Sequence, residues 1–356
     1  MKSIESEIIS RLRWPLMALV VLIHSDVVQV VDYKWGGQII APEVYPIYGF
    51  IRYFLCDVVG RIAVPVFFLI SGFLFFRWTN DFSLAVYKKK IFRRIQSLLV
   101  PYIFWNTIYI LAFFVLGVFS KDSAFDIYRQ FDLMTILKQL WIAPPCFQFW
   151  FLRDLMVMCL CTLFMEPIIK RMKIIAPAIL LIMWLGKMWP SVPGFSPQSC
   201  TFFLLGAYVG IHRVELPEKI RKPSGKILAI LLVVYVVLGL IETYLCDTII
   251  SDYLHNFNIV VGMTVCLELT AYSVNKSVFN IPSYITASSF FIYGYHGLFV
   301  KMLRNFILPI VKPCSDMSFL GIFAIDFIVT ISLGVFLYHL ANRMIPRTTA
   351  LFCGGR

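Results

Sequence analysis

Ten apolar stretches, several of them about 20 residues long, constrain this chain more than any other feature of its sequence. A helix of about 20 apolar residues is long enough to cross the hydrocarbon core of a bilayer. The pattern therefore predicts an all-α, polytopic integral membrane protein, a bundle of about ten transmembrane helices. We place the spans at residues 11–31, 57–77, 98–119, 149–169, 173–189, 199–212, 226–246, 256–274, 284–308 and 318–341.

The composition agrees with this fold class. Hydrophobic residues make up 60% of the 356 positions and charged residues only 15%, whereas a soluble domain carries about a quarter charged residues. No polar stretch is long enough for a separate soluble domain, so we expect a single transmembrane domain over residues 1–356. The first apolar run is followed by no clear small-residue cleavage site, which predicts an uncleaved first span and no removed signal peptide.

The net charge of +12 does not indicate a nucleic-acid partner. With ten spans the basic clusters fall in loops on one side of the membrane, as the positive-inside rule requires, and both termini are predicted to be cytoplasmic. The nine cysteines are scattered and include no C-x-x-C pair. They are therefore expected to be small core residues, with no disulfide framework and no metal site.

One basic segment, residues 83–97, is not predicted to be a span. It alternates apolar residues with Lys88, Lys89, Lys90, Arg93 and Arg94, a pattern typical of an amphipathic helix on the cytoplasmic surface. Two compatible interpretations remain open. The segment anchors the protein to anionic lipid headgroups, or it binds an anionic cytosolic cosubstrate, because clustered arginine and lysine suit phosphate recognition.

A histidine and an arginine mark the first span as a candidate for chemistry. Arg13 and His24 are eleven residues apart, which on a helix is three turns plus roughly 20°, so both lie on one face about 16 Å apart along the axis. His24 either packs as a hydrogen-bonded core residue or takes a proton from a hydroxyl, which a neutral imidazole can do. Asp26 points about 200° away from His24 on an ideal helix and is a secondary partner.

The second span carries a charge and two features that bear on helix packing. Arg61 must pair or face water, and Asp57, one turn earlier, is its expected structural partner. Pro65 frees backbone groups and is expected to kink the helix. The Ser71-Gly72 pair allows close approach of a neighbouring helix.

Further polar residues follow in later spans. Trp150 fits an aromatic belt at the membrane interface, and Arg153 and Asp154 follow it directly. His296 is a second deep histidine, and a metal site shared with His24 is disfavoured because two ligands lack a clear third. The buried charges Glu268 and Asp326 are left without a geometric assignment.

Taken in order, these segments resemble the acyltransferase-3 family of bacterial membrane acyltransferases. The matching pieces are Arg13 and His24 with ten residues between them, RIAVPVFFLISGF at 61–73, KIFRR at 90–94, PYIFWN at 101–106, FWFL at 149–152 and SSFFIYGYH at 288–296. The family's ten-span layout agrees with the span count. The family often carries a fused extracytoplasmic domain that has no counterpart in this sequence, which leaves acceptor choice to the bundle and to outer loops 32–57 and 120–148.

The resemblance implies an O-acetyltransferase of the bacterial cytoplasmic (inner) membrane. It would transfer an acyl group, commonly acetyl, from acetyl-CoA to a hydroxyl of a carbohydrate or cell-envelope glycan, with no metal. His24 would be the catalytic histidine and Arg61 would stabilise the oxyanion. Donor-binding residues would be Arg13, Ser71, Arg93 and Arg94, and substrate-binding residues Trp150, Arg153 and His296. The acceptor's identity and any homo-oligomeric state are left open.

Two alternatives remain. A transporter that flips a glycan or lipid would also need polar groups in the membrane, but the two halves show no inverted repeat. A regulatory or sensory membrane domain is the other alternative. Transfer of labelled acetyl groups to a glycan fraction separates the enzyme from both.

Overall fold

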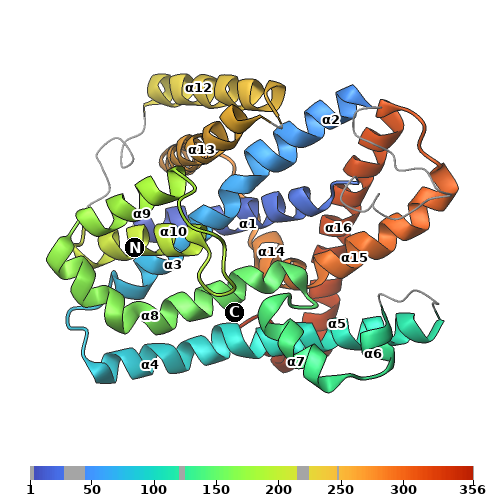
Figure 1. Cartoon of the computed structure of the whole chain (residues 1–356), viewed down its shortest axis with the longest axis horizontal. Helices are drawn as coiled ribbons and strands as arrows, with labels where there is room; N and C mark the ends of the chain where they lie inside the picture. The colour runs from blue at the N-terminus through green and yellow to red at the C-terminus, as the bar shows by residue number, and fades with distance from the viewer. Residues whose placement is uncertain (1–3, 28–44, 120–124, 215–223, 247, 356) are drawn as a thin grey trace.

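The computed structural model describes residues 4–27, 45–119, 125–214, 224–246 and 248–355 (Figure 1). Parts of both predicted outer loops, residues 32–44 and 120–124, lie outside this description. The regular elements in the described ranges are helices, and one isolated bridge joins Val192 to Phe195. In chain order the helices are α1 (Ile4–His24), α2 (Pro46–Arg52), α3 (Ala63–Phe76), α4 (Leu84–Arg94), α5 (Val100–Phe119), α6 (Asp126–Arg129), α7 (Leu133–Ile142), α8 (Trp150–Met172), α9 (Ile175–Leu185), α10 (Pro197–Ile211), α12 (Gly225–Tyr244), α13 (Ile249–Lys276), α14 (Ser283–Ala287), α15 (Ser289–Val311), α16 (Asp316–Met344) and α17 (Pro346–Phe352).

The prediction of a helical membrane protein is confirmed. Within the described ranges, five helices are long and apolar enough to cross a membrane: Pro46–Phe76, Leu84–Phe119, Gly225–Tyr244, Ile249–Lys276 and Asp316–Met344. The other five predicted spans coincide with α1, α8, α9, α10 and α15. Of these, α9 and α10 are short, while α1, α8 and α15 carry several charges. The count of ten spans and the cytoplasmic termini therefore stay predictions.

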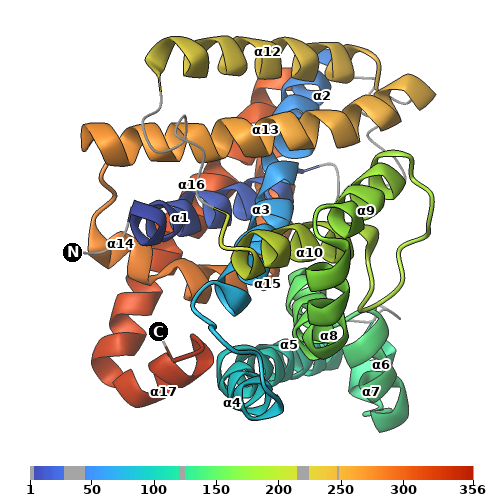
Figure 2. The same ribbon diagram turned by 90° about the vertical axis from the view of Figure 1, so that its left-hand side faces the viewer.

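Helix α1 lies in the middle of the bundle. It contacts α3, α13, α15 and α16, and Figures 1 and 2 both show α12 and α13 on one side of it and α4 and α5 on the other. The outermost helices present apolar side chains outward, for example Ile230 and Val233 of α12, which are 63% and 62% exposed. Such a surface is unfavourable in water and is typical of contact with lipid.

The tightest helix crossing involves Ser71-Gly72, as the sequence predicted. A Cβ atom on Gly72 would overlap the carbonyl oxygen of Phe203 in α10, and one on Gly206 would overlap that of Leu69 in α3. Glycine at both positions lets the two backbones touch. This crossing buries the Gly72 face of α3 against α10 and thereby fixes the direction in which the neighbouring Ser71 points.

The helix that contains Pro65 changes its winding in the turns before the proline ring. The helix that contains Pro65 passes from a π-helical stretch (Tyr53–Val59) through a 3₁₀ turn (Gly60–Ile62) into α3. Proline lacks an N–H and its ring crowds the carbonyl four residues earlier, so the preceding turn must deviate. The winding changes before Pro65, while the predicted kink stays a prediction.

The basic segment 83–97 forms an amphipathic helix, as predicted, and this helix is continuous with the one that follows it. Its amphipathic helix exists as α4, which begins after the N-cap Ser83, but it does not end before the third span. A π-helical stretch, Ile95–Leu99, joins it to α5 without a break. No helix-breaking residue separates the two patterns, and the widened turn accommodates the ring of Pro101. The surface helix and the span are therefore one continuous helix.

Candidate active site

A cavity of about 410 Å³ lies against α1 in the interior of the bundle. We call it the central cavity. Its walls come from α1, α3, α8, α10, α14, α15 and α16, together with the turns before α3 and α5. The lining side chains include Arg13, Met17, Val20, His24, Arg61, Val64, Phe67, Ser71, Leu98, Trp150, Phe151, Gln198, Phe290 and Tyr293.

Arg13 and His24 both line this cavity, so the prediction that they share one helix face is confirmed. The continuous helix Ile4–His24 carries both residues. Eleven residues of α-helix separate them by about 16 Å along the axis. One wall of the cavity thus has a guanidinium near one end and an imidazole at the other.

His24 is held by its own helix and by a second histidine. Its Nδ1 lies 2.8 Å from the carbonyl oxygen of Val20 and 3.2 Å from the Nε2 of His296, while the Nδ1 of His296 lies 3.0 Å from the carbonyl oxygen of Ile292. A carbonyl oxygen only accepts, so in the neutral rings each Nδ1 carries the proton. The Nε2 of His24 is then its unprotonated nitrogen, suited to act as a base or nucleophile.

The structure corrects the expected extent of the first span. The predicted range was 11–31, but α1 begins at Ile4 and ends at His24. Arg304 explains why it ends there: it donates to the carbonyl oxygen of His24 and, over 2.6 Å, to that of Asp26. These donors satisfy carbonyl groups that a helix C-terminus leaves without partners. His24 is therefore a helix-terminal residue, and the ideal-helix angle between His24 and Asp26 does not apply.

Arg304 is itself fixed by a buried carboxylate. Its Nε donates to Asp326 Oδ2 over 2.6 Å, and both side chains are almost fully buried. A buried charge requires such a partner. The ion pair ties α15 and α16 to the end of α1, directly behind His24. Sequence reasoning had singled out Asp326 but not its partner, although a lone arginine in the apolar run of α15 was the available signal.

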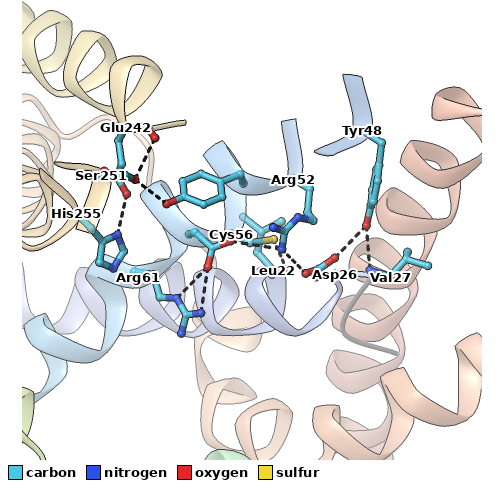
Figure 3. Close-up of polar contacts among 12 residues, drawn as sticks. Leu22, Asp26, Val27, Tyr48, Arg52, Cys56, Arg61, Glu242, Ser251 and His255 are labelled. Atoms are coloured by element: carbon cyan, nitrogen blue, oxygen red, sulfur yellow. Dashed lines mark hydrogen bonds and ion pairs between the residues drawn. The ribbon is translucent and has the colours of Figure 1, made fainter. Parts of the chain in front are cut away.

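Asp26 belongs to a polar cluster beyond the end of α1. Figure 3 shows its carboxylate between Tyr48 and Arg52. The hydroxyl of Tyr48 donates to Oδ1 over 3.0 Å, and Arg52 Nη1 donates to Oδ2 over 2.7 Å. This cluster fastens the segment after His24 to α2, which is a structural role.

Arg61 lines the central cavity and pairs with Asp57, as the sequence predicted. Its Nε and Nη2 both donate to Asp57 Oδ1, over 3.3 and 3.1 Å. The Arg61 side chain remains 45% exposed. Its Nη1 makes no hydrogen bond within the described ranges, so it can bind a negative charge that develops in the cavity.

The other predicted site residues do not all meet at His24. Ser71 and Trp150 line the central cavity. Arg153 does not, because it is buried against Asp154 and donates to the carbonyl oxygens of Trp141 and Ile142. His296 is fully buried behind His24. Their predicted roles stay predictions, and the geometry places Arg153 and His296 behind the cavity wall.

Arg93 and Arg94 lie in a separate basic pocket of about 730 Å³, formed by the end of α3, the following loop and α4. We call it the basic pocket. Lys89, Lys90 and Trp78 line it as well. Arg94 is one turn before Leu98, which lines the central cavity. The two cavities are therefore neighbours along one helix.

Several polar residues of the central cavity were given no role by sequence reasoning, and Gln198 and Tyr293 are two of them. Gln198 and Tyr293 both line the central cavity, and the hydroxyl of Tyr293 donates to the carbonyl oxygen of Gln148 over 2.6 Å. Tyr293 lies within the SSFFIYGYH motif at 288–296, which was the available signal, whereas nothing in its local pattern distinguishes Gln198. Within the described ranges, no group of three or more histidine, cysteine or acidic residues is arranged to hold a metal ion.

Comparison with known proteins gives one match. A family model described as an acyltransferase domain matches residues 8–339, nearly the whole chain. No curated protein and no solved structure matches the chain.

Proposed function

This chain belongs to the acyltransferase-3 family of membrane proteins, and we propose that it moves an acetyl group from cytosolic acetyl-CoA to a hydroxyl of a carbohydrate or cell-envelope glycan. The membrane would be the bacterial cytoplasmic membrane. Acyltransferase activity follows from the family. The donor, the acceptor and the role of His24 are the proposed part.

One observation carries the proposal: Arg13 and His24 line the same cavity from the same helix. Coenzyme A is multiply charged and does not enter hydrocarbon. Its thin pantetheine arm can extend inward while its phosphates stay at a basic rim. That arm is long enough to cover the roughly 16 Å between the levels of Arg13 and His24.

The transfer needs a base, an electrophile and a place for negative charge. His24 Nε2 accepts the proton of the acceptor hydroxyl as its oxygen attacks the thioester carbonyl. The tetrahedral oxyanion lies beside Arg61, whose positive charge stabilises it. When the C–S bond breaks, the thiolate of coenzyme A takes the proton back from His24. The products are the acetyl ester and free coenzyme A.

A relay is the other form of the same proposal. His24 Nε2 attacks the thioester carbonyl, the C–S bond breaks, and coenzyme A leaves as a thiolate that takes a proton from water. The acceptor hydroxyl then displaces the acetyl group from Nε2, and its proton passes to that nitrogen and on to water. Both routes use the same nitrogen and the same oxyanion partner. Burst kinetics with acetyl-CoA in the absence of acceptor distinguishes them, because only the relay releases coenzyme A before acceptor binds.

The basic pocket suits the nucleotide part of the donor. Four basic side chains line it and supply positive charge for phosphate groups: Lys89, Lys90, Arg93 and Arg94. Trp78, whose side chain is 65% exposed, offers a flat surface to an adenine ring. Because Arg94 is one turn from Leu98, a donor held there is close to the wall of the central cavity.

The test uses membranes that contain the full chain, radiolabelled acetyl-CoA and a crude envelope-glycan fraction. We expect label in the glycan with the natural protein and none above background with His24→Ala. The matched control is His339→Ala, since His339 is exposed, does not line the central cavity, and makes its one hydrogen bond among the described residues to the carbonyl oxygen of Tyr284. Full transfer by a membrane-inserted His24→Ala protein would falsify the assignment. Movement of glycan across the membrane without labelling would support the transporter instead.

A further inference from the structure

A second cavity, of about 480 Å³, lies beside the central cavity between α8, α9, α10 and α13. We call it the tryptophan cavity. Trp150 and Gln198 line both cavities, so these two side chains form a shared wall. We propose that the tryptophan cavity is the subsite that binds the carbohydrate acceptor, and that the reacting hydroxyl reaches His24 past Trp150 and Gln198. This inference rests on the proposed acetyl transfer.

The lining of the tryptophan cavity combines aromatic faces with hydrogen-bonding groups. Trp150, Trp184 and Trp189 line it together with Gln198, His255 and Asn256. A sugar ring presents C–H groups on its faces and hydroxyls around its edge, and such a ligand needs flat apolar surfaces next to donors and acceptors. A lipid chain would need neither the amides nor the histidine.

His255 is oriented by a carboxylate that is completely buried. Its Nδ1 lies 2.7 Å from Glu242 Oε1, and Asn258 Nδ2 donates to Glu242 Oε2 over 2.9 Å; Figure 3 shows the His255–Glu242 contact. Because an ionised carboxylate only accepts, Nδ1 carries a proton. Nε2 then has a fixed direction at the cavity wall, and a sugar hydroxyl can donate to it in the neutral ring or accept from it in the charged ring.

The loop before α10 is held in place by the Arg153–Asp154 pair. Asp154 accepts from the backbone N–H of Gly194 over 2.9 Å and of Ser196 over 3.3 Å. Arg153 donates to Asp154 and to the carbonyl oxygen of Trp141. This buried network gives the cavity rim one shape, which lowers the entropy cost of binding. Arg153 then contributes to acceptor binding without touching the acceptor, because it helps to hold the loop that forms the cavity rim.

The two cavities and the basic pocket allow donor and acceptor to enter separately. In the predicted topology the loop before α10 and the start of α13 face outward, whereas the basic pocket faces the cytoplasm. A cytosolic thioester and an exported glycan would then meet at the central cavity without sharing an entrance.

The experiment measures the two Michaelis constants separately. Membranes with the natural protein or with Trp189→Ala receive radiolabelled acetyl-CoA and the envelope-glycan fraction, which is divided into a water-soluble arm and an organic-extractable arm. We expect Trp189→Ala to raise the KM for the accepting arm about ten-fold, the loss expected for one aromatic contact. The KM for acetyl-CoA should not change. Label in the water-soluble arm identifies a free glycan as the acceptor, and label in the organic-extractable arm identifies a lipid-linked sugar.

Matched variants keep the test decisive. Tyr253→Ala is the control, since Tyr253 is exposed on α13 two residues before His255 and does not line the cavity. If Trp189→Ala does not accumulate in membranes, Ser191→Trp replaces it: Ser191 is an exposed loop residue on the cavity rim, and a bulky side chain there should raise the glycan KM. Transfer with an unchanged glycan KM overturns this inference alone. Absence of transfer by the natural protein overturns the proposed function as well.

Discussion

The Nε2 atom of His296 lies 3.2 Å from the Nδ1 atom of His24, although the two residues are 272 positions apart in the chain. The contact joins the last residue of α1 to the middle of α15. With both Nδ1 atoms protonated, His296 Nε2 accepts from the same N–H that points at the Val20 carbonyl oxygen. His296 therefore supports one tautomer and one ring orientation of His24, and is a positioning residue in the proposed reaction.

Replacing His296 should lower the rate without weakening donor binding. We expect His296→Ala to reduce kcat roughly ten- to a hundred-fold, as misplacement of a reacting group does, with the KM for acetyl-CoA unchanged. His24→Ala should cost about 10²–10⁴-fold, the usual contribution of a general base. The double variant should be no slower than His24→Ala, because residues that act as a unit are not additive. Independent, multiplicative losses per inserted molecule would contradict this role.

The Arg304–Asp326 pair should be a large contributor to stability. Arg304→Met leaves a buried carboxylate without its partner, which costs about 3–5 kcal/mol, and removes the cap on α1. We expect a lower unfolding midpoint in detergent, measured by a thermal melt. The double variant Arg304→Met/Asp326→Leu should recover part of the loss, since it removes both charges. Arg343→Met, at an exposed position of α16, is the control and should melt like the natural protein.

Sequence periodicity predicted what lies along a single helix. Arg13 and His24 were assigned to one face from their spacing, Asp57 to Arg61 from theirs, and Ser71-Gly72 to a close crossing. The first follows from 3.6 residues per turn, the second from a separation of only four residues in a continuous helical segment, and the third from the small size of glycine. The first two are confirmed because they concern geometry within one segment, and the third because a glycine permits close approach whichever helix is the partner.

Contacts between distant helices could not be predicted in the same way. The His24–His296 contact, the capping of α1 by Arg304 and the wall shared by Trp150 and Gln198 all depend on which helix faces which. The end of α1 at His24 is an example: an apolar sequence continues beyond it, and the helix ends because Arg304 supplies donors from α15. Periodicity within one segment contains no information about such partners.

The α3–α10 crossing should tolerate no added methyl group. Gly206→Ala would force the backbones of the two helices apart, and overpacking of this kind costs at least about 1–3 kcal/mol. We expect a lower melting temperature and less protein in the membrane. Gly321→Ala is the matched control, because no atom lies within 4 Å of a Cβ built there. It should be neutral or slightly stabilising, by about 0.5–1 kcal/mol, since alanine favours a helix interior. Equal melting temperatures for both variants would argue against the crossing.

The positive charges of the basic pocket should affect the KM for acetyl-CoA and not the KM for the glycan. Arg94 is half-buried and stacks over Phe75, with its guanidinium carbon 5.9 Å from the ring centroid, so its position is fixed at the pocket wall. Lys88 is on the same helix, is exposed and does not line the pocket. Removing a charge-assisted phosphate contact costs about 1.5–3 kcal/mol, so Arg94→Ala should raise the KM for acetyl-CoA roughly ten- to a hundred-fold. The glycan KM should stay constant, and Lys88→Ala should leave both constants unchanged.

Added salt should weaken donor binding by the natural protein more than by Arg94→Ala, because one screened contact is already missing. If Lys88→Ala and Arg94→Ala raise the donor KM equally, a diffuse surface charge attracts the donor and the basic pocket is not its binding site.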